Sequence, residues 1–173
     1  MSNFFSYKSI SRESIPDALE KAGRYRLLGE PEEAESVCLD ILQADPGHQE
    51  ALVSLILAVT DQFRKERRPR VELARRCVAQ LDDEYARRYY TAVVSERDAL
   101  AYLNQGNVPA LALLRFIEAM EQYAQAEEVR PPGDDSPILR WNACLRVIRR
   151  RNLKPGLEKE SYVSPAELGG KGA

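Results

Sequence analysis

The sequence lacks the residue patterns that most enzymatic and metal sites require. It has one histidine, His48, which lies in the turn-like segment DPGHQE, and its three cysteines include no CxxC pair. A metal site needs several ligands at short spacing, and a catalytic triad needs a base beside its nucleophile. The glycine-rich stretch GGKG stands near the C-terminal end with no predicted strand before it, which is not the setting of a phosphate loop. We therefore expect a protein that is not an enzyme and that needs neither a metal nor a cofactor.

The sequence also lacks the patterns that indicate disulfides or membrane-spanning helices. Cys38, Cys77 and Cys144 are an odd set with no pairing framework, which indicates reduced thiols in a cytoplasm-like compartment. All three fall on apolar helical stripes, so we expect them to pack in the core. No apolar stretch approaches the roughly 20 residues of a membrane span. The first residues, MSNFFSYKSISRES, have no basic start followed by an apolar run, so the sequence predicts a cytoplasmic protein without a signal peptide or membrane contact.

The chain as a whole also lacks a large net charge, because it has 25 basic and 27 acidic residues. The balance hides a basic segment at residues 64–76, RKERRPRVELARR. Arginine and lysine bind nucleic-acid phosphates, but no aromatic residues alternate with these arginines as a surface for single strands requires. The sequence therefore disfavours nucleic acid as a partner. A solvated basic face, or one paired with the acidic first hairpin of a neighbouring molecule, is the simpler interpretation.

What the sequence does contain is a nearly continuous helical pattern from Ile15 to Arg151. Apolar residues recur at three- and four-residue spacing, and the alternation typical of strands is missing. Ser14 and Ser136 are expected to cap helices, and Pro69 is expected to separate two of them. Seven helices are predicted. The first runs from 15 to 29, the second from 29 to the turn ADPGH, and the third over about 49–65. The fourth follows residue 69, and the last three cover about 84–105, 108–128 and 136–152.

Turn-forming and polar residues divide the chain into three parts. Residues 1–14 are predicted to be an N-terminal extension, and residues 15–152 a single helical domain. Residues 153–173 have few apolar side chains, so we expect a flexible C-terminal tail, which could include a short docked segment around Tyr162 and Val163.

An internal repeat runs through the predicted helices. Its first unit has Ala22 and Tyr25 in one helix, Ala34 and Cys38 in the next, and a closing proline. Ile56 follows Ala22 by 34 residues and has apolar neighbours at matching spacings. Looser copies follow at spacings of 43 and 46 residues, with small, apolar or aromatic residues at Ala99, Tyr102, Ala112, Phe116, Ala119, Trp141, Cys144, Leu145 and Ile148.

This pattern resembles the tetratricopeptide repeat (TPR) family, most clearly over about residues 15–63. The resemblance implies an all-α fold, an α-α superhelix of about three TPR-like hairpins with a C-terminal capping helix. In this family, the first helices of the hairpins line a concave face that binds extended peptides or helices of other proteins. The same kind of partner is implied here.

The resemblance also predicts which residues line that groove. Some TPR proteins hold a terminal carboxylate with lysine, asparagine and arginine. Asn104, Asn142 and Arg146 are similar to part of that set, whereas Leu19 and Gly23 stand where its lysine and first asparagine would be. We therefore expect a groove for an acidic or carboxylate-bearing segment rather than for a chaperone tail. Its expected peptide contacts are Arg26, Asn104, Asn142, Arg146 and Arg149, and the same register places Val53, Leu57, Asp61, Glu96 and Leu100 on this face.

The sequence favours a non-enzymatic adaptor or scaffold that binds a protein or peptide partner. A self-associating structural module that forms a homodimer is one alternative. Anion or nucleic-acid binding through the arginines at 64–76 and 146–151 is another. His48 and the acidic clusters at 82–84 and 134–135 are expected to be turn, capping or solvated residues rather than catalytic ones.

Overall fold

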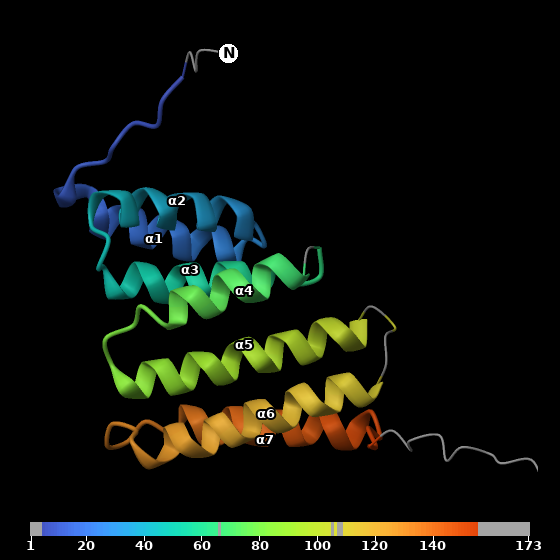
Figure 1. Ribbon diagram of the computed structural model, residues 1–173. Coiled ribbons are helices and arrows are strands. Elements are labelled where there is room, and N and C mark those ends of the chain that lie inside the picture. The colour runs from blue at the N-terminus through green and yellow to red at the C-terminus, as the bar shows by residue number, and fades with distance from the viewer. Residues whose placement is uncertain (1–4, 66, 105, 107–108, 156–173) are drawn as a thin grey trace, which may run out of the picture.

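The computed structural model describes residues 5–65, 67–104, 106 and 109–155, and within these ranges the chain has helices and no strand (Figure 1). A short 3-10 turn, η1, at Arg12–Ser14 precedes seven α-helices in this part of the chain. They are α1 (Ile15–Leu27), α2 (Pro31–Ala44), α3 (Gln49–Asp61), α4 (Arg67–Val78), α5 (Glu84–Asn104), α6 (Pro109–Glu128) and α7 (Ser136–Arg150). The predicted all-α fold and the order of its helices are confirmed. The expected tail from residue 156 onward, with Tyr162 and Val163, lies outside the described residues.

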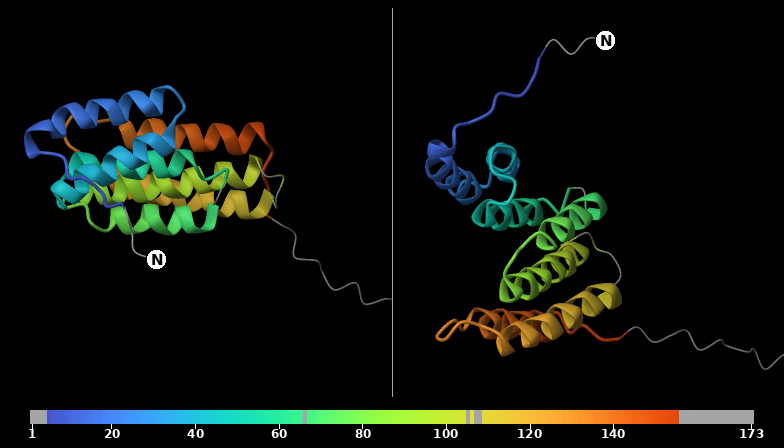
Figure 2. Two further views of the ribbon diagram at one scale, coloured as in Figure 1. Left: turned by 90° about the horizontal axis from the view of Figure 1, so that it is seen from above. Right: turned by 60° about the vertical axis from the view of Figure 1, so that its left-hand side comes forward.

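Each helix packs against the next one in the chain to form a curved stack (Figure 2). α1 also contacts α3, and α3 contacts α5, so the odd-numbered helices share one side of the stack and the even-numbered helices the other. We call these sides the odd-helix face and the even-helix face. In Figure 2, α1 and α7 project beyond α3 and α5, which makes the odd-helix face concave. This is the superhelical arrangement that the sequence predicts.

The small and apolar residues of the internal repeat form the core. Its alanines are fully buried, which lets neighbouring helices approach closely, at Ala22, Ala34, Ala99, Ala112 and Ala119. One core cluster joins the first four helices to α5, and a second joins α5 to α6 and α7. α5 contributes side chains such as Val94 to the first cluster and Val93 to the second. This helix therefore connects the two halves of the stack.

Two details of the predicted helix boundaries are wrong, and a third holds only in part. Pro69 lies inside α4 and does not end a helix. A proline is tolerated there because N–H groups of the first helical turn have no acceptor within the helix. Ser14 is the N-cap residue of α1, as expected, but it makes no side-chain capping hydrogen bond, since its hydroxyl donates to the carbonyl of Ser11 at 2.8 Å. Ser136 is the first residue of α7 and not its cap, and its backbone N–H donates to the Asp134 carboxylate at 2.9 Å.

Glu96 is a buried carboxylate that links α5 to α6 and α7. It is 5% exposed, the Tyr123 hydroxyl donates to its Oε2 at 2.7 Å, and Arg140 Nη2 lies 2.9 Å from the same oxygen. Burial, together with the charge of Glu96, raises the pKa of Tyr123, so this phenol keeps its proton and donates it. The predicted groove position of Glu96 is therefore wrong. A carboxylate in a protein interior requires a partner charge, and Arg140 supplies it.

We expect Glu96→Ala to lower the free energy of unfolding by about 2–4 kcal/mol, because it leaves Arg140 and Tyr123 without their acceptor. Urea unfolding followed by circular dichroism measures the loss. Glu20→Ala is the matched control, since Glu20 pairs with Arg24 on the exposed side of α1, where such a pair contributes about 0–1 kcal/mol. Equal losses in the two variants would contradict a structural role for Glu96.

Candidate functional site

Two hollows lie between α3 and α5 on the odd-helix face. The apolar hollow, of about 420 Å³, is near the N-terminal ends of both helices. Val53, Leu81 and Ala86 line it, together with exposed acidic residues at 50, 82 and 83. The polar hollow, of about 200 Å³, is near the C-terminal ends, and its lining includes Asp61, Arg97, Leu100 and Asn104. The concave side of the stack therefore offers an apolar and a charged recess along one line.

Asp61 is the centre of charge at the polar hollow. Arg26 of α1 donates from Nε to Asp61 Oδ2 at 2.9 Å, and Arg97 Nη1 of α5 lies 3.5 Å from Oδ1. Asp61 and Arg26 are both half-buried. Through its two arginine partners, Asp61 links α3 to α1 and α5 at one end of the stack. Arg26 is thus already paired, and its role at the groove is to hold Asp61 rather than to offer a free positive charge.

The structure brings only some of the expected groove residues together. Asn104 lines the polar hollow beside Asp61, which is the partner of Arg26. Asn142, Arg146 and Arg149 belong to neither hollow. They lie on α7, whose apolar side packs on the second core cluster, with Arg146 and Arg149 exposed and Asn142 half-buried. The predicted contacts therefore form two separate groups.

Arg97 is the residue of this face that the sequence reasoning missed. The expected register placed Glu96 on the odd-helix face, but Arg97 lines the polar hollow there with Leu100 and Asn104. The sequence does indicate that Arg97 belongs to this face, because residues 97, 100 and 104 have the three- and four-residue spacing of one helical face. The correct register gives the polar hollow one more basic side chain than predicted.

Several residues that stood out in the sequence serve as helix caps. His48 Nδ1 accepts the N–H of Ala51 at 3.3 Å at the start of α3. Asp83 Oδ2 accepts the N–H of Ala86 at 2.8 Å at the start of α5. The carboxylate of Asp134 accepts from Ser136 and, at 2.5 Å, from the hydroxyl of Tyr85, and these hydrogen bonds lower the pKa of Asp134. Capping was among the roles expected for the acidic residues, whereas the cap formed by His48, expected only as a turn residue, is an addition.

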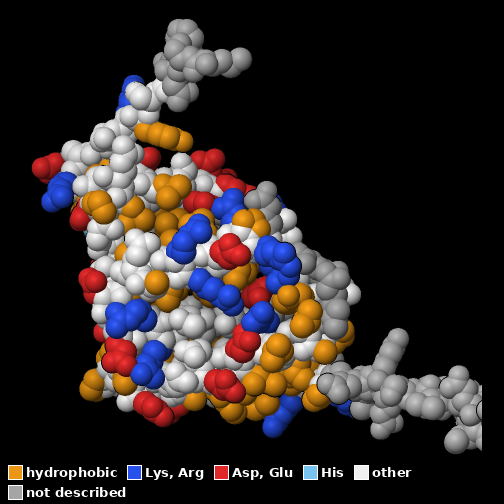
Figure 3. All heavy atoms as spheres, viewed as in Figure 1, with side chains coloured by type: hydrophobic (Ala, Val, Ile, Leu, Met, Phe, Trp, Pro, Cys, Tyr) orange, Lys and Arg blue, Asp and Glu red, His pale blue; other side chains and the backbone are white. Residues whose placement is uncertain are grey.

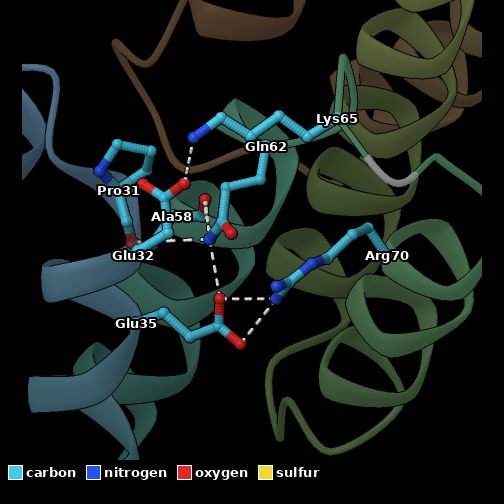
Figure 4. Close-up of polar contacts among 7 residues, drawn as sticks. All are labelled: Pro31, Glu32, Glu35, Ala58, Gln62, Lys65 and Arg70. Carbon is cyan, nitrogen blue, oxygen red and sulfur yellow. Dashed lines mark hydrogen bonds and ion pairs between the residues drawn. The ribbon is translucent and has the colours of Figure 1, made fainter.

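Part of the basic segment is paired within the molecule (Figure 4). Arg70 of α4 donates from Nη1 to both oxygens of Glu35 of α2, at 2.6 and 2.7 Å. Gln62, which follows α3, donates to the same carboxylate at 2.6 Å, and Lys65 pairs with Glu32. Lys65 and Arg70 thus pair with the acidic first hairpin of the same chain, while Arg68, Arg75 and Arg76 are exposed, as expected for a solvated basic face.

The three cysteines are buried, which confirms the expected packing role. Burial raises the pKa of the Cys38 and Cys144 thiols to about 12 and also raises that of Cys77. A raised pKa means that the reactive thiolate is scarce at neutral pH. These side chains therefore behave as small apolar groups.

We expect iodoacetamide at pH 8 to leave all three thiols of the native protein unmodified. With a pKa of about 12, the thiolate fraction of Cys38 or Cys144 is on the order of 10⁻⁴ at that pH. Mass spectrometry counts the adducts, and the same reaction in urea should modify all three cysteines. Rapid modification of one thiol in the folded protein would show that it is accessible and contradict the packing role.

In the part of the chain that the structure describes, no three His, Cys, Asp or Glu residues are grouped so as to hold a metal ion. None of the helices there combines the length and apolar character needed to cross a membrane. No family model, no curated protein and no solved structure matches the chain. The resemblance to TPR repeats therefore stays a prediction from the residues of this chain.

Proposed function

We propose that this chain is a non-enzymatic, TPR-like adaptor or scaffold that binds a protein or peptide segment on its concave odd-helix face. The observation that carries the proposal is the pair of hollows between α3 and α5, one apolar and one charged. A peptide groove needs an apolar pocket for an anchoring side chain and polar groups that fix the orientation of the ligand. With its three buried thiols, the protein suits a reducing, cytoplasm-like compartment.

The spacing of the two hollows limits the partner. Val53 and Asp61 are eight residues apart on α3, or roughly 12 Å along the helix axis. An extended peptide covers that distance with about four residues, since each adds about 3.3 Å. We expect an apolar anchor at one end and, about four residues away, an acidic group that accepts hydrogen bonds from Arg97 and Asn104.

Charge sets the direction of the bound segment. The apolar hollow has acidic residues at its edge, which favour a basic residue beside the anchor. The exposed Arg146 and Arg149 on α7, with Asn142, supply positive charge and hydrogen-bond donors at the far end of the same stack. An acidic or carboxylate-bearing end of the partner is best placed toward α7.

Ser54→Arg tests the apolar hollow, because it puts a long charged side chain into the recess without removing a core contact. We expect capture of the native partner from cell lysate, quantified by mass spectrometry, to fall about tenfold or more. Ser9→Arg makes the same chemical change at an exposed position away from this hollow and should leave capture unchanged. If both variants capture the partner as well as the parent protein does, this hollow is not the binding site.

Asn142→Ala combined with Arg146→Ala tests the α7 contacts. Both residues lie away from the core side of α7, so the melting temperature should stay nearly unchanged while partner capture is lost. Differential scanning calorimetry and the same capture assay provide the two readings. A large drop in melting temperature would instead assign these two residues to the support of α7.

A further inference from the structure

A third hollow lies on the even-helix side, between α4, α5 and α6. Its volume is about 190 Å³, and its lining includes Arg67, Arg68, Arg75 and Arg115, two carboxylates and Tyr102. We call it the arginine hollow. Figure 3, which shows the even-helix face, has lysine and arginine side chains interspersed with acidic ones near the middle of the molecule. The arginine hollow is separate from the two hollows proposed to bind a peptide.

Asp98 orients two of the arginines. It is 2% exposed, Arg67 Nη1 donates to its Oδ1 at 2.8 Å, and Arg115 Nε lies 3.3 Å from its Oδ2. The guanidinium carbon of Arg67 also lies 3.8 Å from the centre of the Tyr102 ring. A guanidinium has five N–H donors, so each arginine keeps donors beyond those that Asp98 uses. The buried carboxylate therefore fixes the positions of these two arginines.

The charge of Asp98 is neutralised by these contacts and does not repel an anion in the hollow. Arg115 shares a second acidic neighbour, because its Nη1 donates to Glu118 at 2.6 Å. Arg68 and Arg75 are exposed and lie two turns apart on α4, roughly 10 Å along its axis. No carboxylate pairs with either of them among the residues that the structure describes. Arg68 and Arg75 outnumber Glu72 at the mouth of the hollow and give it a net positive charge.

The size of the arginine hollow suits a small oxyanion. A water molecule occupies about 30 Å³ in the liquid, so the 190 Å³ of the arginine hollow is the space of roughly six waters. That space is enough for an oxyanion of about five heavy atoms and its hydration. Planar guanidinium groups arriving from α4 and α6 match the several acceptor oxygens of a phosphate better than the two oxygens of a carboxylate. A nucleic-acid strand needs a longer positive track, and Glu72 interrupts the arginines of α4.

The geometry points to a phosphate-binding site at the arginine hollow, with Arg68 and Arg75 at its mouth and Arg67 and Arg115, held by Asp98, at its base. The ligand is a phosphate group, either on a phosphorylated side chain or as the free ion. This site is independent of the proposed peptide groove, since it is on the other side of the stack.

Titration of the full chain with inorganic phosphate tests this site by NMR, with sodium chloride at equal ionic strength as the reference. We expect backbone amide signals of α4 and α6 to shift and saturate with phosphate but not with chloride. Arg68→Gln with Arg75→Gln should weaken binding about tenfold or more, because it removes two charged donors whose side chains are exposed. Arg150→Gln with Arg151→Gln removes the same charge from the exposed C-terminal end of α7 and should change the affinity by less than about twofold.

Three results would overturn the assignment: shifts that do not saturate, equal shifts with chloride, or equal weakening in the α7 control. Tighter, arginine-dependent binding of a single-stranded oligonucleotide would replace it with nucleic-acid binding. N-acetyl-phosphoserine amide identifies the source of the phosphate. Binding at least as tight as that of inorganic phosphate assigns the site to a phosphorylated side chain, and binding more than about tenfold weaker assigns it to the free ion.

Discussion

Three consecutive residues of α5 determine how the helices around it are joined. Successive side chains on an α-helix point about 100° apart, so three neighbours in sequence reach three directions. Glu96 pairs with Arg140 of α7, and Arg97 reaches Asp61 of α3. Asp98 meets arginines of both α4 and α6. A buried carboxylate that lost its partner would cost several kcal/mol, so these pairs restrict which helices can lie beside α5.

A second polar cluster joins neighbouring helices in the N-terminal half of the stack. Glu35 of α2 accepts from Gln62 and Arg70, which join it to the end of α3 and to α4. Arginines of α1, α4, α5, α6 and α7 thus neutralise acidic residues of other helices. In the basic segment, Arg67 and Arg70 are half-buried in such pairs, whereas Arg64, Lys65, Arg68, Arg75 and Arg76 are exposed.

The helices and their order could be predicted because apolar spacing and chain turns are local properties of the sequence. The core positions of the repeat, including Cys38 and Cys144, were also predictable, since a regular helix carries such residues on one side. The buried ion pairs were not predictable, because Asp98 and Arg67 are 31 residues apart and nothing local marks them as partners. The same limit applies to the binding face. The repeat register, extrapolated along the 21 residues of α5, placed Glu96 instead of Arg97 on the odd-helix face.

α5 also borders recesses on both sides of the stack. Its C-terminal half forms a wall of the polar hollow through Leu100 and Asn104 and a wall of the arginine hollow through Asp98 and Tyr102. The two recesses open on opposite sides of the stack and share a single wall, an element about three turns long.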